Sequence, residues 1–296
     1  MGAKPHLKSQ KILLTGANGF TGRWFAAMAK ETGQEIVALN VDLMDAALEA
    51  EILKYNPDAV VHLAGISFVA SKDQEAFYRV HALGTSRLLE ALSKLPQPPK
   101  KVLLASSATV YGNVGPAQSL ENQALSPIDH YATSKVAMEE MAKTFFHQLP
   151  IVIVRPFNYT GPGQKPNFLI PKLIAHFAEK KASIELGNLN IEREFNSVKM
   201  ICSAYFGLLQ FGEPGEIYNV SSGQAHSLQF VIDILIKLTG HTPQIRVNPN
   251  FVRASEVYRM CGDPQKLNSL LQAHGVLLPT ISLESTFQEM LLDAKK

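Results

Sequence analysis

A short glycine-rich segment near the N-terminus constrains the fold more than any other part of the chain. Gly16, Gly19 and Gly22 lie three residues apart, between an apolar stretch expected to be a strand, 11–15, and a helical stretch, 23–32. Glycine lets such a turn close tightly and lets a pyrophosphate approach the amides at the start of the helix. An ordinary glycine-rich connection is the alternative, but the strand before it and the helix after it favour dinucleotide binding.

Strands and helices alternate through the first half of the chain. The predicted strands are 35–39, 58–63, 101–106 and 151–155, and the predicted helices are 46–55, 74–95 and 131–148. This alternation indicates parallel βαβ units, so we predict an α/β fold with a doubly wound parallel Rossmann sheet. Ligands bind such sheets at the carboxyl ends of the strands.

The composition excludes several classes of protein. The 296 residues are 46% apolar and 18% charged, which suits one large unit or two lobes with a real core. A net charge of +2 without a basic block argues against nucleic acid as a partner. No apolar run approaches the ~20 residues of a membrane span, and residues 1–10 lack an apolar signal region. Cys202 and Cys261 are isolated, so we expect reduced thiols, a cytoplasmic location and no metal site.

Tyr131 and Lys135 share one face of a predicted helix because they are four residues apart. An ammonium group beside a phenol lowers the phenol pKa from roughly 10. Such a tyrosine can exchange a proton with an alcohol or carbonyl near neutral pH. Ser107, at the end of a predicted strand, could support this chemistry. The structural alternatives are an aromatic with a wet tip for Tyr131 and a hydroxyl that satisfies backbone for Ser107.

The end of the second predicted strand lacks the acidic residue that would hold the ribose hydroxyls of NAD. Asn40 stands there, followed closely by Asp42 and Leu43. Without a carboxylate nothing repels a 2′-phosphate, which favours NADP(H) over NAD(H). Arg23 could bind that phosphate or be a solvated surface arginine, and Asp42 could receive the adenine amino group or cap a helix.

Six segments resemble, in their order along the chain, the motifs of the extended short-chain dehydrogenase/reductase family. They are 15–22, 62–65, 106–112, 131–135, 155–164 and 216–223. The resemblance covers nearly the whole chain. Within the family, the chain is most similar to the group of GDP-4-dehydro-6-deoxy-D-mannose reductases, which form GDP-D-rhamnose.

The resemblance implies a catalytic trio of Ser107, Tyr131 and Lys135. Tyr131 would protonate the alkoxide formed when a nicotinamide reduces the C4 ketone of a GDP-sugar, and Ser107 would hydrogen-bond the reacting oxygen. Lys135 would bind the nicotinamide ribose and hold the tyrosine pKa down. The implied cofactor-binding residues are Gly16, Asn18, Gly19, Phe20, Gly22, Arg23, Asn40, Asp42, Leu43, Leu63, Ala64 and Gly65, together with Tyr131 and Lys135.

The second half of the chain is implied to hold the nucleotide sugar. Arg193 and Arg253 match positions that bind diphosphate in the family, and arginine engages phosphate oxygens bidentately. The N-terminus of a helix predicted from 167 to about 181 could also meet a diphosphate. Taken alone, each of these charged residues could equally well be a solvated residue of the surface without a binding role. The implied substrate-binding residues are Ser107, Thr109, Asn158, Asn167, Phe168, Lys172, Arg193, Arg253 and Glu256.

Departures from the family pattern reduce the number of family activities that can be expected of this chain. Ala108 and Thr109 stand where sugar-nucleotide dehydratases place acidic residues, so dehydration is not expected. His81 replaces a common asparagine and could relay protons or lie on a helix face without chemistry. A later family motif usually has three acidic residues; here two of them are lost and Glu194 stands in place of the third. A 4-epimerase that retains NAD and a non-catalytic NAD(P)-binding regulator are the alternative functions.

The resemblance also implies two lobes and a homodimer. The cofactor lobe is expected to comprise 1–157 with returning segments about 196–224 and 257–264. A smaller α/β substrate lobe would comprise about 158–195, 225–256 and 265–296. The predicted helices 74–95 and 131–148 lie where family members pair. The product could be GDP-D-rhamnose or its C4 epimer, GDP-6-deoxy-D-talose.

Overall fold

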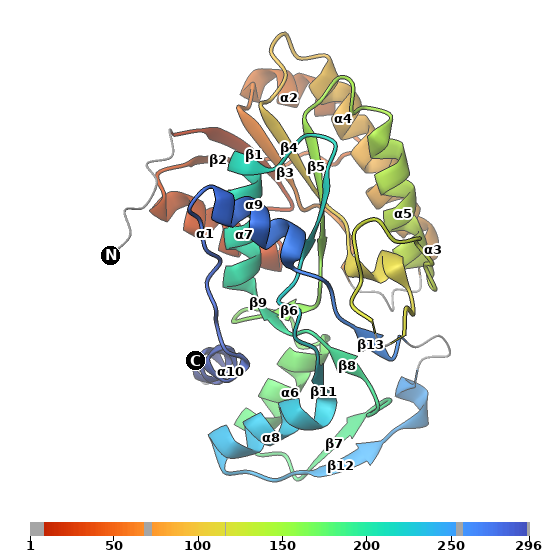
Figure 1. Ribbon diagram of the computed structural model, residues 1–296, viewed down its shortest axis with the longest axis vertical. Helices are drawn as coiled ribbons and strands as arrows, with labels where there is room; N and C mark the ends of the chain where they lie inside the picture. Colours follow the sequence, from red (N-terminus) through yellow and green to blue (C-terminus); the bar gives the residue numbers. More distant parts are fainter. Residues whose placement is uncertain (1–8, 68–72, 116, 253–256, 295–296) are drawn as a thin grey trace. The chain divides into compact units, whose positions relative to one another are not determined.

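The computed structural model describes residues 9–67, 73–115, 117–252 and 257–294 (Figure 1). The chain divides into two compact units. Unit 1 comprises Met1–Ser106, Thr133–Val154 and Ala204–Tyr218, and unit 2 comprises Ser107–Ala132, Arg155–Ser203 and Asn219–Lys296. These ranges differ from the lobes expected from the sequence, whose bounds stay a prediction.

Unit 1 is built on a six-stranded sheet with the order β10-β5-β4-β3-β1-β2. Its strands are β1 Lys11–Thr15, β2 Glu35–Ala38, β3 Ala59–His62, β4 Lys101–Ala105, β5 Ile151–Pro156 and β10 Ile217–Val220. The neighbours from β2 through β5 pair in parallel, which confirms the predicted parallel α/β fold. The strand order reverses at β1, and this reversal is where doubly wound sheets bind ligands.

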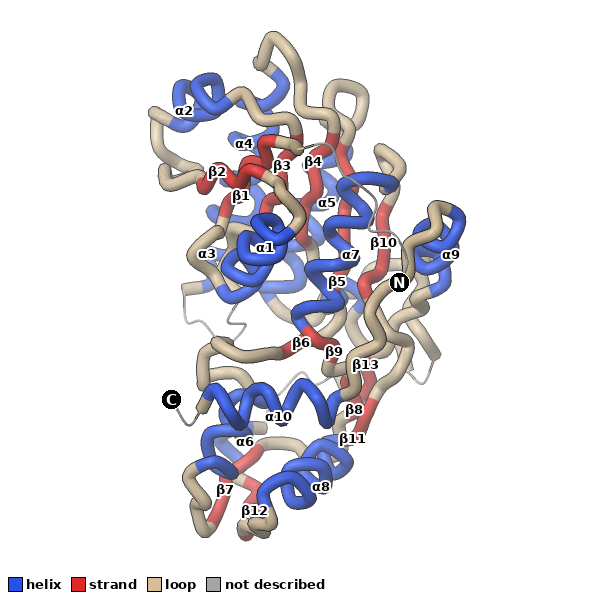
Figure 2. Tube along the Cα trace, turned by 90° about the vertical axis from the view of Figure 1, so that its left-hand side faces the viewer, coloured by secondary structure: helices blue, strands red, loops and turns tan. Residues whose placement is uncertain are grey.

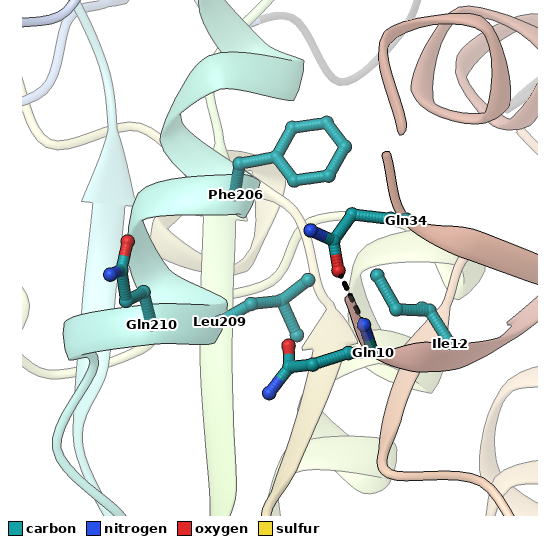
Figure 3. A pocket seen from close by; sticks show the side chains of 6 residues that line it. All are labelled: Gln10, Ile12, Gln34, Phe206, Leu209 and Gln210. Atoms are coloured by element: carbon teal, nitrogen blue, oxygen red, sulfur yellow. Dashed lines mark hydrogen bonds between the residues drawn. The ribbon is translucent and has the colours of Figure 1, made fainter. Parts of the chain in front are cut away.

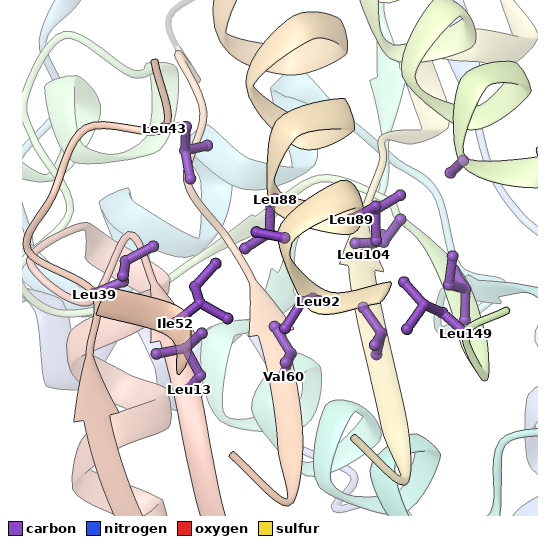
Figure 4. Close-up of a cluster of buried hydrophobic side chains, with 14 of the residues drawn as sticks. Leu13, Leu39, Leu43, Ile52, Val60, Leu88, Leu89, Leu92, Leu104 and Leu149 are labelled. Carbon is purple, nitrogen blue, oxygen red and sulfur yellow. The ribbon is translucent and has the colours of Figure 1, made fainter. Parts of the chain in front are cut away.

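One face of the sheet is covered by α2 (Leu48–Tyr55), α4 (Thr85–Ser93) and α5 (His130–Lys143). Alternate side chains of a strand point to opposite faces, so each strand contributes every second residue to this core. Figure 4 shows leucines of α4 that point toward Val60 and Leu104 of the sheet. Burial of this cluster holds α4 and α5 against that face of the sheet.

The opposite face carries α1 (Phe20–Glu31) and the C-terminal part of α7 (Val198–Phe211). Phe25 and Phe206 stack between these helices with their ring centroids 4.3 Å apart. A shallow hollow beside α7 is lined by Gln10, Ile12, Gln34, Phe206, Leu209 and Gln210 (Figure 3). Its polar side chains are amides, and Gln34 already accepts a hydrogen bond from the Gln10 backbone at 3.0 Å, so the hollow has no acid or base for catalysis.

The predicted helix 74–95 is helical but not uniform. It divides into α3 (Gln74–Tyr78), a π-helical turn η1 (Arg79–Gly84) and α4. A π turn adds a residue to one turn and is frequent at functional sites. His81 lies in this turn and is 1% exposed, so it is not a solvated helix-face residue.

Other predicted bounds shift by a few residues. α1 begins at Phe20 rather than at 23, because Gly19 already accepts the first helical hydrogen bond from the Arg23 amide at 3.0 Å. Gly22 therefore lies inside the first helical turn. α5 ends at Lys143, and α6 spans Leu169–Ala178.

Unit 2 contains a core of three helices, α6, α8 (Leu228–Thr239) and α10 (Leu283–Asp293), with strand β7 (Figure 2). Ser227 caps α8 by accepting from the Phe230 amide at 3.1 Å, and Gly240 ends it with a φ of 64°. Its other elements are η2 Ala108–Tyr111, β6 Tyr159–Thr160, β7 Ser183–Leu186, β8 Glu192–Arg193, β9 Asn196–Ser197, β11 His226–Ser227, β12 Gln244–Val247, η3 Pro249–Phe251, β13 Arg259–Met260 and α9 Gln265–Ala273.

Candidate active site

The glycine turn packs so closely that side chains cannot fit. Gly16 has a φ of +70°, and a Cβ there would lie 2.8 Å from the Leu63 carbonyl and the Ala64 amide. A Cβ on Gly22 would collide with the Gly16 carbonyl oxygen. The first turn of α1 contains no acidic side chain, so the positive end of the helix dipole is not neutralised there. The segment has the geometry expected of a pyrophosphate site, although its binding role stays a prediction.

The residues after β2 take local structural roles. The exposed carboxylate of Asp42 accepts from the Met44 amide at 2.7 Å, so it caps a turn. The exposed Arg23 donates from Nη1 to the Asn18 carbonyl at 2.7 Å, which keeps its guanidinium at the glycine turn. Asn40 is exposed, and Leu43 is buried against Gly84. The predicted adenosine contacts of these residues stay untested.

A buried histidine, His62, ties the end of β3 to its neighbours. Its Nδ1 lies 2.7 Å from the Thr15 hydroxyl, and its Nε2 lies 2.8 Å from the Thr85 hydroxyl. Thr15 in turn accepts from the Ala64 amide at 3.0 Å. Burial, and then the charge of Lys135, lowers the pKa of His62 to about 3, so the ring is neutral. Sequence reasoning gave His62 no role, because its partners are 23 and 47 residues away.

Tyr131 and Lys135 lie one turn apart on α5, as predicted. The helix start is held by Asp129, whose carboxylate accepts from the Ala132 amide at 2.7 Å. Lys135 is buried, and its Nζ donates to the Ala105 carbonyl at 2.8 Å. Burial lowers the pKa of Lys135 to about 8, and the negative charge of Glu139 opposes that shift.

Glu139 continues the same helix face one turn beyond Lys135, and sequence reasoning missed it. Its side chain is 0% exposed and accepts a hydrogen bond from the Ser106 hydroxyl. Spacing of four residues from Lys135 would have indicated a shared face. The bond to Ser106, 33 residues away, could not be read from spacing.

Ser107 forms hydrogen bonds with Thr109 and with Tyr131. The Ser107 hydroxyl oxygen accepts from the Thr109 amide at 3.2 Å and from the Thr109 hydroxyl at 2.9 Å. A hydroxyl has two lone pairs and one hydrogen, so its hydrogen is left to donate. A hydrogen bond with Ser107 lowers the Tyr131 pKa, consistent with donation to the phenol oxygen.

The predicted lowering of the Tyr131 pKa is nevertheless wrong in direction. Burial raises the pKa of Tyr131 above 10.0, the Ser107 hydrogen bond opposes this, and the charge of Asp129 adds to the rise. Removing a phenolate from water costs more here than the hydrogen bond returns. Tyr131 is therefore a protonated phenol at neutral pH.

The predicted substrate residues of unit 2 are engaged in different ways. Arg193 is buried and donates to the carbonyls of Glu192, at 3.0 Å, and Val257. Lys172 donates to the Glu185 carbonyl at 2.8 Å and lies 4.5 Å from the centre of the Phe251 ring.

Asn158 and Asn167 have exposed side chains, and Phe168 is the N-cap of α6. Arg253 and Glu256 lie outside the described residues. The structure thus leaves substrate binding by this group a prediction.

Two buried networks explain motif residues that have no chemical role in the prediction. Glu194 is 0% exposed and accepts from Ser221 at 2.6 Å, the Gly262 amide at 2.7 Å and the Ser222 amide at 2.8 Å. Asn196 donates to it as well, at 2.9 Å. The retained acid therefore joins three loops of unit 2.

Tyr111 forms the second network. It accepts from Arg155 at 2.9 Å and donates to the Asn219 amide oxygen at 2.6 Å. All three side chains are buried, so these motif positions maintain the fold of unit 2.

The described residues contain neither a metal-binding cluster nor a membrane-spanning helix. Among residues 9–67, 73–115, 117–252 and 257–294, no three His, Cys, Asp or Glu side chains are placed to hold a metal ion. Within that same part of the chain, helices are all too short or too polar to cross a membrane. Cys202 and Cys261 are buried and unpaired by disulfide.

Known proteins are similar to this chain in both sequence and fold. A family profile described as GDP-mannose 4,6-dehydratase matches residues 18–290. The GDP-6-deoxy-D-talose 4-dehydrogenase of Aggregatibacter actinomycetemcomitans is 34% identical over 267 residues, covering 88% of this chain and 91% of that protein. The GDP-6-deoxy-D-mannose reductase of Pseudomonas aeruginosa is 32% identical over 275 residues, covering 88% and 90%. The structure of RMD from Pseudomonas aeruginosa complexed with NADPH has a TM-score of 0.87 and 29% identity, covering 97% of this chain and 98% of that one.

Proposed function

We propose that this protein reduces the C4 ketone of GDP-4-keto-6-deoxy-D-mannose, because it belongs to the GDP-mannose 4,6-dehydratase family of extended short-chain dehydrogenases/reductases. It is an NAD(P)-dependent oxidoreductase that acts on GDP-sugars, as the names of its relatives indicate. The observation that carries the proposal is the hydrogen bond between Ser107 and Tyr131, on the helix that also carries Lys135.

The protonation states suit reduction. When bound, a reduced nicotinamide supplies the hydride for the ketone carbon. Tyr131 is protonated because burial raises its pKa, so it can give its proton to the alkoxide oxygen. When the sugar is bound, the single Ser107 hydrogen would turn from the phenol oxygen to that alkoxide oxygen, while the two hydrogen bonds from Thr109 hold the Ser107 oxygen in place. Lys135, with a pKa of about 8, is mostly an ammonium at neutral pH and favours the negative charge that Tyr131 acquires.

Elimination of water is not part of the proposal, although the family profile carries a dehydratase name. Dehydration across C5 and C6 needs an acid and a base beside the sugar. Ala108 has neither and is buried, and the Thr109 hydroxyl is committed to Ser107. These two positions support reduction and argue against dehydration.

The nicotinamide cofactor is proposed to be NADP(H) rather than NAD(H). Two features support this preference: Asn40 replaces an acidic residue, and Arg23 lies at the glycine turn. The similar reductase structure was solved with NADPH. The ratio of kcat/KM for NADPH and NADH tests the preference, and a higher value with NADH would remove it.

The remaining assignments belong to the same proposal. We assign the sugar nucleotide to Ser107, Thr109, Asn158, Asn167, Phe168, Lys172, Arg193, Arg253 and Glu256. A homodimer formed through α3–α4 and α5 and a cytoplasmic location follow from the family resemblance and the isolated cysteines. Light scattering of the purified protein tests the dimer.

The decisive experiment uses GDP-4-keto-6-deoxy-D-mannose with NADPH and then NADH. Loss of absorbance at the reduced-nicotinamide band, and NMR of the product, would support the reductase and distinguish GDP-D-rhamnose from GDP-6-deoxy-D-talose. A protein that purifies with tightly held NAD and interconverts C4 epimers would instead be the 4-epimerase. Cofactor binding without turnover of GDP-, dTDP- or UDP-sugars would indicate the non-catalytic regulator.

A further inference from the structure

The π turn η1 places His81 between two other elements of unit 1. His81 Nε2 accepts a hydrogen bond from the Ile66 amide at 3.0 Å, in the loop after β3. His81 Nδ1 lies 2.8 Å from the hydroxyl of Ser134 on α5. His81 and Ser134 are 1% and 0% exposed, so their bond is shielded from bulk water, and the bond to the Ile66 amide is partly buried.

These contacts fix the tautomer of the ring. A backbone amide can only donate, so Nε2 must be unprotonated and the ring hydrogen lies on Nδ1. The ring therefore donates to Ser134 while it accepts from Ile66. Burial, and then the positive charge of Lys135, lowers the pKa of His81 to about 2, which agrees with a neutral ring.

The loop and the helix that His81 joins both carry predicted cofactor residues. Gly65 directly precedes Ile66, and Lys135 directly follows Ser134. A Cβ placed on Gly65 would lie 3.1 Å from His81 Nε2 and 3.7 Å from Lys135 Nζ. The histidine ring, the glycine and the lysine ammonium are thus immediate neighbours, and a shift of the ring would alter the spacing between the loop and Lys135.

We propose that His81 is a positioning residue: by joining the Ile66 amide to the Ser134 hydroxyl, it holds the loop 64–66 at a fixed spacing from Lys135, so that both can engage one nicotinamide cofactor. It does not relay protons, because Nε2 is occupied by an amide that cannot take a proton. This inference rests on the proposed function only for the identity of the bound cofactor.

Two substitutions separate the two bonds. In a glutamine at position 81 the terminal amide reaches roughly where Nε2 lies, whereas in an asparagine it reaches roughly where Nδ1 lies. His81→Gln can therefore keep the bond to Ile66, and His81→Asn can keep the bond to Ser134. His81→Phe keeps the ring shape and loses both bonds. His147→Gln, at an exposed histidine, is the matched control.

The primary measurement is the Kd for NADPH, repeated with NADH, from quenching of nucleotide fluorescence without sugar. His81→Gln should bind within about threefold of the unaltered protein. His81→Asn should bind about tenfold more weakly, the effect of losing one buried hydrogen bond, and His81→Phe at least as weakly. Equal Kd values for all variants would overturn the proposal.

Turnover distinguishes positioning from proton relay. Glutamine cannot ionise, so a relay role predicts that His81→Gln loses kcat by about 100-fold while its Kd is unchanged. Positioning predicts that His81→Gln keeps kcat within a few fold. A hundredfold loss of kcat with unchanged Kd would therefore refute the positioning role.

The positioning role of His81 can still be tested if the proposed function is wrong. If NADPH binds but the GDP-sugar is not reduced, the Kd series still tests His81. If neither nucleotide binds, hydrogen exchange of the Ile66 amide provides the test. That amide should be protected in the unaltered protein and in His81→Gln and exchange faster in His81→Asn, and equal exchange in all three would contradict the proposal. If His81→Phe does not fold, the Gln and Asn variants carry the comparison alone.

Discussion

Two buried carboxylates occupy contrasting surroundings in this protein. Glu139 lies on the α5 face that also carries Tyr131 and Lys135, and its charge raises the Lys135 pKa against the effect of burial. Glu194 is equally buried, but the donors that reach it are neutral amides and hydroxyls. Glu139 tunes the pKa of a buried cation on the same helix, whereas the hydrogen bonds of Glu194 hold its neutral donors in place. The α5 face should therefore govern rate, and the Glu194 network should govern stability.

Tyr131→Phe should produce the largest effect and leave stability nearly unchanged. The phenol hydrogen is the proposed proton for the sugar alkoxide, and loss of a general acid typically lowers kcat by about 10²–10⁴-fold. Cofactor affinity should be retained, because the ring stays in place. Steady-state kinetics and thermal unfolding measure the two quantities. Tyr55→Phe, at the end of α2, is the control, and turnover within tenfold of normal in Tyr131→Phe would end the assignment.

Glu194→Ala should show the reverse pattern. It leaves the Gly262 and Ser222 amides without their acceptor, whereas the Ser221 hydroxyl can still donate to the Gly262 carbonyl at 2.9 Å. Each unsatisfied buried group costs about 1–3 kcal/mol. With partial relaxation of the loops, we expect a loss of about 3 kcal/mol in the free energy of unfolding.

The kcat per folded Glu194→Ala molecule should stay within a few fold. Urea unfolding and active-site titration test both parts. Glu284→Gln removes an exposed partner of Lys237 and should cost less than about 1 kcal/mol. A large fall in kcat with unchanged stability would reverse the contrast between the two carboxylates.

Acid should destabilise the protein through the histidines beside α5. The pKa values of His62 and His81 are lowered by burial to about 3 and about 2, whereas an unfolded histidine titrates near 6.5. Below pH 6.5 the unfolded chain binds protons that the folded chain does not, so stability falls as pH falls, and above it the effect vanishes.

Between pH 7.5 and 5.5 each histidine should therefore cost about 1.4 kcal/mol. Urea unfolding at the two pH values measures this loss, and His81→Gln should show a decline smaller by one histidine's share. An equal decline in the variant and in the unaltered protein would place the acid sensitivity elsewhere.

The sequence predicted what depends on local order and left out what depends on distant contacts. Strand and helix alternation gave the parallel sheet, and a spacing of four residues placed Tyr131 and Lys135 on one face. Ile66 and Ser134 are 15 and 53 residues from His81, so the role of that residue was undecided between relay and inert histidine. The direction of the Tyr131 pKa was missed for a related reason, because burial is set by the whole fold, whereas only the neighbouring lysine could be read from the sequence.

The smallest predicted effect concerns Glu139→Gln, and it tests whether this carboxylate tunes Lys135. Removing its charge removes the interaction that raises the Lys135 pKa, so that pKa should fall below about 8 and the ammonium should be lost at lower pH. The alkaline limb of the pH–kcat profile should shift to lower pH, with a loss of a few fold at pH 8 and little change at pH 6.5. Glutamine can still accept from the Ser106 hydroxyl, so the local structure is retained. Glu140→Gln, the next residue, removes an exposed partner of Lys143 and should leave the profile in place. A shift in both variants would reflect general charge, and no shift in Glu139→Gln would mean that the buried carboxylate near Lys135 is as purely structural as Glu194.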